Sequence, residues 1–379
     1  MTRPVDLATV ETPVAVVDLP RARANARRVV AYASEHGLAW RPHVKTHKSR
    51  AMARVQLEAG ARGLTVATLH EAEVMSTVCD DLLLAYPPVG AAKLARLVRL
   101  PETVRLSVAL DAPEVLYPLS RAVREAGRTI DVLVELDVGL GRVGIGEPSE
   151  AARLAAEITE LPGVRFQGLM FYAGHLRAPG PEQDRGMAEL AGFLERTYEA
   201  LEGRGLEAEV VSGGTTPTLW RSHELPGLTE IRPGTCIYFD RDAVAQGAAT
   251  PDEWAYSVLA TVVSTRVPGR AAVDAGSKAL AKEARGPAGF GVLLEHPEIT
   301  VTALSEEHGV LDLSGSGWQP RVGDRVRIVP NHVCVSVNLQ DHIVVVDGGR
   351  AEAWPLEGRG RGPWPESQES HQKRSTWNS

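Results

Sequence analysis

The sequence predicts an α/β protein with a (β/α)8 TIM-type barrel followed by a smaller C-terminal β domain. Two observations support this fold class. Through the first two-thirds of the chain, short apolar runs alternate with longer amphipathic stretches, a pattern typical of a parallel sheet covered by helices. After about Asp240 the alternation stops, and short apolar runs follow one another between Gly and Pro turns. A length of 379 residues suits one large domain and one smaller domain.

The first region holds roughly eight strand-then-helix units, a number that suits a closed barrel better than an open sheet. The apolar runs predict strands at residues 14–18, 39–44, 64–67, 82–85, 106–110, 131–137, 166–171, 209–212 and 230–232. The amphipathic stretches predict helices at residues 20–36, 49–59, 70–77, 91–99, 114–126, 149–160 and 183–204. We assign residues 13–245 to the barrel.

The second region has few helical stretches. Its apolar runs predict strands at residues 256–266, 271–275, 299–305, 310–313, 325–329 and 342–346. We assign residues 246–356, together with residues 1–12, to the β domain. Residues 357–379 are rich in Gly, Pro, Ser and charge and show no periodicity, which predicts a disordered tail.

Composition excludes several classes of protein. The net charge of −7 and the absence of a long basic run predict no nucleic-acid partner, and no stretch of about 18 apolar residues predicts a membrane span. Three cysteines in so long a chain argue against a disulfide framework, and residues 1–12 have no signal-peptide core. We therefore expect a cytoplasmic protein.

The first candidate site residue is Lys45. In a barrel, chemistry takes place at the C-terminal ends of the strands, and Lys45 directly follows the predicted strand 39–44. A lysine amine in the barrel mouth can act as a nucleophile toward a carbonyl group. The alternative is a solvated loop carrying Lys45 and Lys48, the commoner outcome for this residue type.

Two glycine-containing turns follow late barrel strands. They are Ser212-Gly213-Gly214-Thr215 and Arg232-Pro233-Gly234-Thr235. Small residues let backbone amides approach an anion, and late strands are where barrels usually bind phosphate. Each turn alone is a weak signal, but the two together with Lys45 indicate a phosphorylated cofactor.

Three further side chains follow apolar strands. Arg142 lies in a loop with several glycines and could donate to a cofactor oxygen or ring nitrogen, or pair with a structural acid. Tyr172 and His175 are candidate acid–base groups. A packed tyrosine and a hydrogen-bonded core histidine are the alternative.

The β domain contributes His332 and Cys334. If this segment is extended, the two side chains point to the same face and supply two converging metal ligands. Imidazole and thiolate together suit Zn²⁺, and two ligands leave the open positions that a catalytic metal needs. The alternative is a buried cysteine and an unrelated histidine.

Several segments together resemble the D-serine dehydratase and D-threonine aldolase family, whose members are fold-type III pyridoxal 5'-phosphate (PLP) enzymes with an alanine-racemase-like barrel. The resemblance covers roughly residues 10–355. The segments that carry it are Pro42-His43-Val44-Lys45-Thr46-His47-Lys48, Tyr172-Ala173-Gly174-His175, Ser212-Gly213-Gly214-Thr215, Arg232-Pro233-Gly234-Thr235, Asp274-Ala275-Gly276-Ser277-Lys278, Ser305-Glu306-Glu307-His308-Gly309 and Pro330-Asn331-His332-Val333-Cys334.

The resemblance implies a role for each candidate. Lys45 would carry PLP covalently, Arg142 would contact the cofactor ring, and Tyr172 would lie near cofactor and substrate. His332 and Cys334 would bind a divalent metal beside the substrate hydroxyl, with zinc preferred and manganese or magnesium as alternatives. The phosphate would be held by Ser212, Gly213, Gly214, Thr215, Gly234 and Thr235. The resemblance also implies a homodimer and a small D-amino acid substrate.

Two reactions remain open on this scaffold. Removal of the Cα proton by Lys45 leads to dehydration, whereas removal of the hydroxyl proton by another base leads to cleavage into glycine and an aldehyde. Family dehydratases resemble this chain in pairing His with Cys, which favours dehydration of a D-3-hydroxy-amino acid. An amino-acid racemase would have no use for the metal pair, and a non-catalytic PLP-binding protein would lack the β domain.

Overall fold

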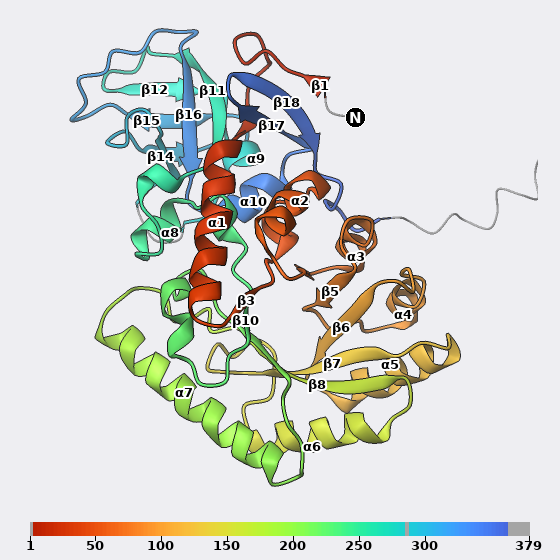
Figure 1. Ribbon diagram of the computed structural model, residues 1–379. Helices are drawn as coiled ribbons and strands as arrows, with labels where there is room; N and C mark the ends of the chain where they lie inside the picture. The colour runs from red at the N-terminus through yellow and green to blue at the C-terminus, as the bar shows by residue number, and fades with distance from the viewer. Residues whose placement is uncertain (1–2, 285–287, 363–379) are drawn as a thin grey trace, which may run out of the picture.

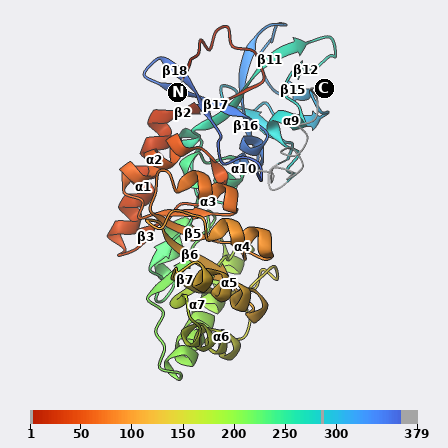
Figure 2. The same cartoon turned by 90° about the vertical axis from the view of Figure 1, so that its right-hand side faces the viewer.

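The computed structural model describes residues 3–284 and 288–362. These residues form two domains, with the barrel in the lower part of Figure 1 and the β domain above it. The 90° view in Figure 2 shows the same division, with α1 and α2 beside the boundary. Within the described ranges, no helix is long and apolar enough to cross a membrane.

The barrel is an eight-stranded parallel sheet with strand order β3-β10-β9-β8-β7-β6-β5-β4. An isolated parallel bridge between His43 and Thr65 joins β3 to β4, so that the sheet curls round on itself. The predicted barrel is confirmed. Its strands are β3 (Ala39–Trp40), β4 (Leu64–Val66), β5 (Asp81–Leu84), β6 (Arg105–Leu110), β7 (Ile130–Leu136), β8 (Val164–Phe171), β9 (Val210–Gly213) and β10 (Glu230–Ile231).

Amphipathic helices cover the outside of the barrel, as their sequence patterns predict. Local signals set their ends: the Asp18 carboxylate accepts the Arg21 N–H at the start of the first helix, and Gly60, at φ +112°, ends the second. These helices are α1 (Leu19–Glu35), α2 (Arg50–Ala59), α3 (Leu69–Met75), α4 (Ala91–Leu97), α5 (Pro113–Glu125), α6 (Pro148–Glu160) and α7 (Pro181–Glu202). The short helix α8 (Arg241–Ala245) follows β10.

The β domain is built on a ten-stranded, mostly antiparallel sheet. It also carries the short helices α9 (Ser277–Leu280) and α10 (Val333–Asn338). Its strands are β1 (Arg3–Pro4), β2 (Val14–Asp18), β11 (Tyr256–Ser264), β12 (Arg270–Val273), β13 (Gly291–Leu293), β14 (Val301–Leu304), β15 (Gly309–Asp312), β16 (Arg325–Pro330), β17 (His342–Asp347) and β18 (Arg350–Pro355).

One predicted barrel strand belongs to the other sheet. β2 pairs antiparallel with β11 and parallel with β17, although α1, which follows it, packs against the barrel. The barrel sheet therefore begins at β3 rather than at residue 13. A strand followed by a helix looks the same in sequence whichever sheet the strand joins, because its hydrogen-bond partners lie far away in the chain.

The predicted tail is also ordered where the structure describes it. Leu356 is 4% exposed within the main core, and the Gly358 N–H donates to the Lys48 carbonyl at 2.8 Å. Residues 357–362 therefore lie against the barrel, because hydrogen bonds to distant residues replace the missing local pattern. Residues 363–379 of the predicted tail lie outside the described residues.

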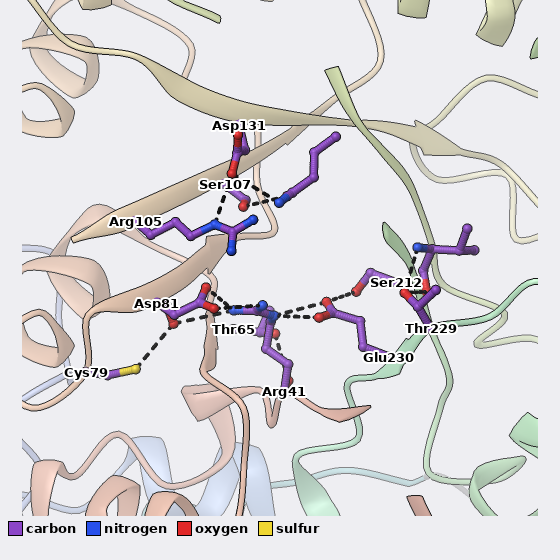
Figure 3. A network of polar contacts seen from close by, with 12 residues as sticks. Arg41, Thr65, Cys79, Asp81, Arg105, Ser107, Asp131, Ser212, Thr229 and Glu230 are labelled. Carbon is purple, nitrogen blue, oxygen red and sulfur yellow. Dashed lines mark hydrogen bonds and ion pairs between the residues drawn. The ribbon is translucent and has the colours of Figure 1, made fainter. Parts of the chain in front are cut away.

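The barrel interior contains a network of polar side chains as well as apolar ones. Figure 3 shows Arg41 between Asp81 and Glu230, with Arg105 and Asp131 nearby. The Arg41 Nε lies 2.9 Å from Glu230 Oε2, and its Nη1 lies 2.6 Å from Asp81 Oδ1. Burial alone would lower the pKa of Arg41, but these two carboxylates outweigh it and raise that pKa above its usual value.

Candidate active site

A pocket lies where the C-terminal ends of the barrel strands meet the β domain. Its walls come from the segments that follow β3, β8, β9 and β10, and from the residue that precedes α10. The residues that line it are His43, Lys45, Thr46, Tyr172, Gly174, Arg177, Gly214, Thr215, Thr216, Pro217, Arg232, Pro233, Gly234, Thr235, Asp240, Asp242, Ala243, Gln246 and His332. Seven of the predicted site residues line this pocket: Lys45, Tyr172, Gly214, Thr215, Gly234 and Thr235 from the barrel, and His332 from the β domain.

Lys45 lies in a single 3-10 turn, Val44–Thr46, which begins four residues after β3 ends at Trp40. Its Nζ is 5.7 Å from the centroid of the Tyr172 ring, and Tyr172 is the first residue after β8. The Arg142 guanidinium lies 5.1 Å from the same centroid. The structure thus brings Lys45, Tyr172 and Arg142 together from loops that follow three different strands.

The two glycine turns form one wall of the pocket. Gly214 has a φ of +78°, a backbone conformation that residues other than glycine rarely adopt. At Gly234 a Cβ atom would lie 2.3 Å from the His43 carbonyl oxygen, so only glycine fits there. With Thr215 and Thr235 beside them, these glycines leave a space lined by backbone and hydroxyl groups, which is what a phosphate group needs.

Two predicted phosphate ligands are not brought to the pocket. Ser212 is fully buried on β9, and its hydroxyl donates to Glu230 Oε1 at 2.7 Å. Gly213 lies beneath the Phe171 ring, where a Cβ atom would be 2.3 Å from the nearest ring carbon. Both residues are buried in the strand that precedes the pocket, because β9 extends to Gly213 and the turn begins only at Gly214.

His175 also lies away from the pocket wall. It is exposed and lines a separate cavity beside the start of α7, together with Arg185. Its Nε2 would meet a Cβ atom on Gly139 at 3.3 Å, which places the ring against the loop that carries Arg142. Spacing from Tyr172 does not show this, since Gly174 and Arg177 on either side of this residue both line the pocket.

Arg232 is a pocket residue that the sequence reasoning passed over. It precedes the glycine turn after β10, is 7% exposed, and donates from Nη2 to the Phe171 carbonyl. Within the described part of the chain, its Nε has no hydrogen-bond partner. Burial lowers the pKa of Arg232, while the Glu135 carboxylate opposes that change. A buried donor without a partner in a pocket wall indicates that a ligand completes it.

His332 and Cys334 meet the barrel beside Lys45. The extended conformation considered from the sequence holds only as far as His332, because α10 begins at Val333 with His332 as its N-cap, so that Cys334 lies in the helix. The Asp240 carboxylate accepts the Val333 N–H at 3.0 Å, which satisfies a free donor of the first helical turn. The Cys334 Sγ lies 3.2 Å from Thr46 Oγ1, one residue from Lys45.

The chemistry of this pair fits a metal ion. Burial alone would raise the pKa of the Cys334 thiol, but the neighbouring His332 and Lys45 charges lower it to about 7. Burial opposes the charged form of His332, yet Cys334 and Asp240 raise its pKa to about 11. A readily formed thiolate is a good ligand for a soft divalent ion.

Asp240 is the second residue that the sequence reasoning missed. Its Oδ2 lies 3.1 Å from His332 Nδ1, which leaves Nε2 as the nitrogen available to a metal. In residues 3–284 and 288–362, no cluster of three or more His, Cys, Asp or Glu side chains is placed to hold a metal ion. Two protein ligands would leave positions open for substrate.

Comparison with known proteins relates both domains of the chain to known protein families. Residues 17–242 match the family described as alanine racemase, N-terminal domain, and residues 255–346 match a putative serine dehydratase domain. The chain is 36% identical over 360 residues to D-threonine aldolase from Arthrobacter sp, covering 93% of this chain and 94% of the relative. The chain belongs to the D-serine dehydratase and D-threonine aldolase family. Members of this family are PLP-dependent lyases.

Other relatives in the D-serine dehydratase and D-threonine aldolase family carry different names. D-threo-3-hydroxyaspartate dehydratase from Delftia sp. (strain HT23) is 33% identical, covering 92% of this chain and 97% of the relative. The crystal structure of D-threonine aldolase from Filomicrobium marinum superposes with a TM-score of 0.87 at 32% identity, covering 94% of this chain and 99% of that one. A cysteine-to-alanine variant of the dehydratase has been solved in a metal-free form.

Proposed function

We propose that this protein is a PLP- and divalent-metal-dependent lyase that dehydrates a D-3-hydroxy-amino acid to a 2-oxo acid and ammonia. One observation carries the proposal: Lys45 and His332, from different domains, line a single pocket, and Cys334 contacts Thr46 in its wall. An amine, a phosphate cradle and a soft metal pair are the parts that this reaction needs.

The residues of the pocket fit the cofactor. The glycine turns around Gly214 and Gly234 would hold the phosphate of PLP, and Lys45 would carry the cofactor covalently. Bound PLP would supply an electron sink for negative charge at the substrate Cα. The unpartnered Nε of Arg232 would donate to the bound group, and the ring of Tyr172 would limit its movement beside Lys45.

The β domain would complete the site. The Cys334 thiolate and His332 Nε2 would hold the metal, while Asp240 fixes the orientation of the His332 ring. A metal at this position would supply a Lewis acid for the substrate hydroxyl. Zinc matches the softness of this ligand pair best, and manganese or magnesium remain the alternatives.

The position of the candidate bases supports dehydration. Lys45 lines the pocket, where its amine would be the group placed to take a proton from the substrate Cα. His175, the other predicted base, lines a separate cavity. Cleavage of the Cα–Cβ bond would need a base at the hydroxyl group instead.

Retro-aldol cleavage to glycine and an aldehyde is the second candidate, because the Arthrobacter relative at 36% identity is a D-threonine aldolase. The deciding experiment incubates the protein, reconstituted with PLP and Zn²⁺, with D-serine, D-threonine and D-3-hydroxyaspartate. The products 2-oxo acid, ammonia and glycine are measured together, with and without a chelator.

Formation of 2-oxo acid and ammonia that stops on chelation is the expected result. Formation of glycine and an aldehyde would show that the protein catalyses retro-aldol cleavage and not dehydration. Equal activity with and without chelator, or interconversion of D- and L-amino acids, would contradict the metal-dependent lyase and favour a racemase.

A homodimer and a cytoplasmic location belong to the same proposal. The family resemblance supports the dimer, which sedimentation or light scattering would test. The three cysteines, Cys79, Cys236 and Cys334, are all free, as expected in a reducing compartment.

A further inference from the structure

The described residues that follow β18 remain in contact with the barrel. Residues 356–362, which we call the strap, pass from the end of β18 to the barrel. Leu356 anchors the start of the strap in the core, and Arg96 of α4 donates to the Arg361 and Gly362 carbonyls at its end. The strap is therefore held at both ends, although it has no regular secondary structure.

Between these anchors, the strap contacts the segment that follows Lys45. The Gly358 N–H donates to the Lys48 carbonyl at 2.8 Å. The Glu357 carboxylate accepts from the Arg50 backbone N–H at 3.1 Å and from its Nε at 3.0 Å. The Glu357 carbonyl lies 2.9 Å from His70 Nε2 on α3.

Lys48 receives this contact in an unusual conformation. Its φ is +52°, a left-handed conformation that is strained for a residue with a Cβ atom and persists only when its surroundings enforce it. Its N–H donates to the Val44 carbonyl at 2.8 Å, and its Nζ lies 2.5 Å from the buried Glu71 carboxylate. With the strap on its carbonyl, Lys48 is fixed at three points.

These three points define the turn that carries Lys45. The Val44 carbonyl accepts from both His47 and Lys48, so Lys45 and Thr46 lie in a loop whose far end is Lys48. No strap residue is among those that line the pocket, and the contacts above join the strap to Lys45 through this loop.

We propose that the strap is a positioning element for Lys45: Glu357 and Gly358 hold Lys48, and Lys48 sets the orientation of the Lys45 turn. This inference rests on the proposed role of Lys45 as the residue that carries PLP. The strap contributes no group to the chemistry, so its loss should change kcat and the lysine–cofactor bond while leaving KM nearly unchanged.

Two variants change the contact by different means. In Gly358→Ala, the new Cβ would lie 3.1 Å from the Lys48 carbonyl oxygen, so this backbone must shift by a few tenths of an ångström. In Glu357→Gln, the charge that holds the start of α2 is removed. The matched control is Glu295→Gln, because Glu295 accepts from the N–H and Nε of Arg327 in the same arrangement on the β domain.

Three readouts follow the PLP-loaded variants: steady-state kinetics, the pH titration of the lysine–cofactor absorbance band, and amide hydrogen exchange over residues 44–50. We expect Gly358→Ala to lose about tenfold in kcat, since small misplacements of a reacting group have effects of this size. Glu357→Gln should lose less, about threefold, because this ion pair is partly exposed. Both should shift the band's titration and speed exchange in residues 44–50, and Glu295→Gln should do neither.

Two results would overturn the inference. One is a Gly358→Ala protein with the kcat, band titration and exchange of the unmutated protein. The other is a uniform rise in exchange across the barrel with an unchanged band, which would make the strap a general stabiliser. Failure of the proposed role of Lys45 is read separately, on the unmutated protein, which would then show no lysine–cofactor band, and failure of the proposed reaction is read from the products of the unmutated protein. The exchange of residues 44–50 in cofactor-free protein would still test the strap.

Discussion

Two buried arginines follow neighbouring strands of the barrel and have opposite surroundings. Arg41 follows β3 and is held by Glu230, Asp81 and the Asp81 carbonyl. Arg232 follows β10, and its Nε has no partner among the described residues. One guanidinium is satisfied by the fold and the other faces a pocket. The difference separates a charge that stabilises the barrel from a charge that we assign to a ligand.

The same contrast extends to the residues around each arginine. Ser212 looks like a phosphate ligand in sequence but donates to Glu230, so it belongs with Arg41. Gly214, only two residues later, lines the pocket with Arg232. Pairing inside the fold, rather than residue type, decides which group is available for binding.

The largest expected effect comes from Lys45→Ala, which should affect the pocket and leave the interior network unchanged. We expect a loss of kcat on the order of 10⁴-fold, because a covalent catalytic group is removed. The lysine–cofactor absorbance band should also disappear. The midpoint of thermal unfolding of cofactor-free protein should not change, since Lys45 is exposed. A large fall in that midpoint would show that Lys45 is a structural residue.

Arg41→Met and Arg232→Met break the comparison directly. Arg41→Met leaves Glu230 and Asp81 without their cation and should lower the free energy of unfolding by roughly 3–5 kcal/mol. Arg232→Met should cost less stability in cofactor-free protein but weaken PLP binding. Urea unfolding and cofactor titration measure the two quantities. Equal losses of stability would mean that the two arginines do not differ as we describe.

Cys334→Ser changes the metal pair alone. The hydroxyl is a poorer ligand for a soft ion, so we expect Zn²⁺ affinity and activity to fall by about 10–100-fold. PLP content should stay unchanged, because the glycine turns and Lys45 are intact. Metal analysis and absorbance spectra check both points. Full activity in the variant would remove Cys334 from the proposed ligand set.

Glu135 gives the smallest effect. Burial raises its pKa to about 7 from a usual 4.5, with Arg232 and Arg142 opposing the change. Between pH 4.5 and 7, the Glu135 carboxyl therefore keeps a proton in the folded protein that it releases in the unfolded chain. The stability from this group is present below pH 4.5 and is lost as the pH rises toward 7, at most about 1.4 kcal/mol per pH unit. Unfolding of cofactor-free Glu135→Gln should depend less on pH over this window, and an unchanged slope would contradict the assignment.

Much of the fold could be predicted from the sequence, because helices and strands leave local periodic patterns. The assignment of β2 failed because its partners, β11 and β17, lie more than two hundred residues away. The strap escaped notice for the same reason, since residues 356–362 have no periodicity and are held only by distant groups.

The candidate site divides in the same way. Lys45, Tyr172, Gly214 and Gly234 follow strands, and the position of strand ends in a barrel is predictable. Arg232 and Asp240 were missed because their roles depend on which neighbours lack or supply a partner. His175 lines a cavity other than the one that holds Lys45 and Tyr172, and spacing along the chain does not show which cavity a loop residue lines.

The most direct test of the central claim is to reduce the PLP-loaded protein with borohydride and map the labelled peptide by mass spectrometry. We predict that the cofactor is found on Lys45 and that the Lys45→Ala protein carries none. Label on Lys48, or on any other lysine in the unmutated protein, would contradict the account of this pocket.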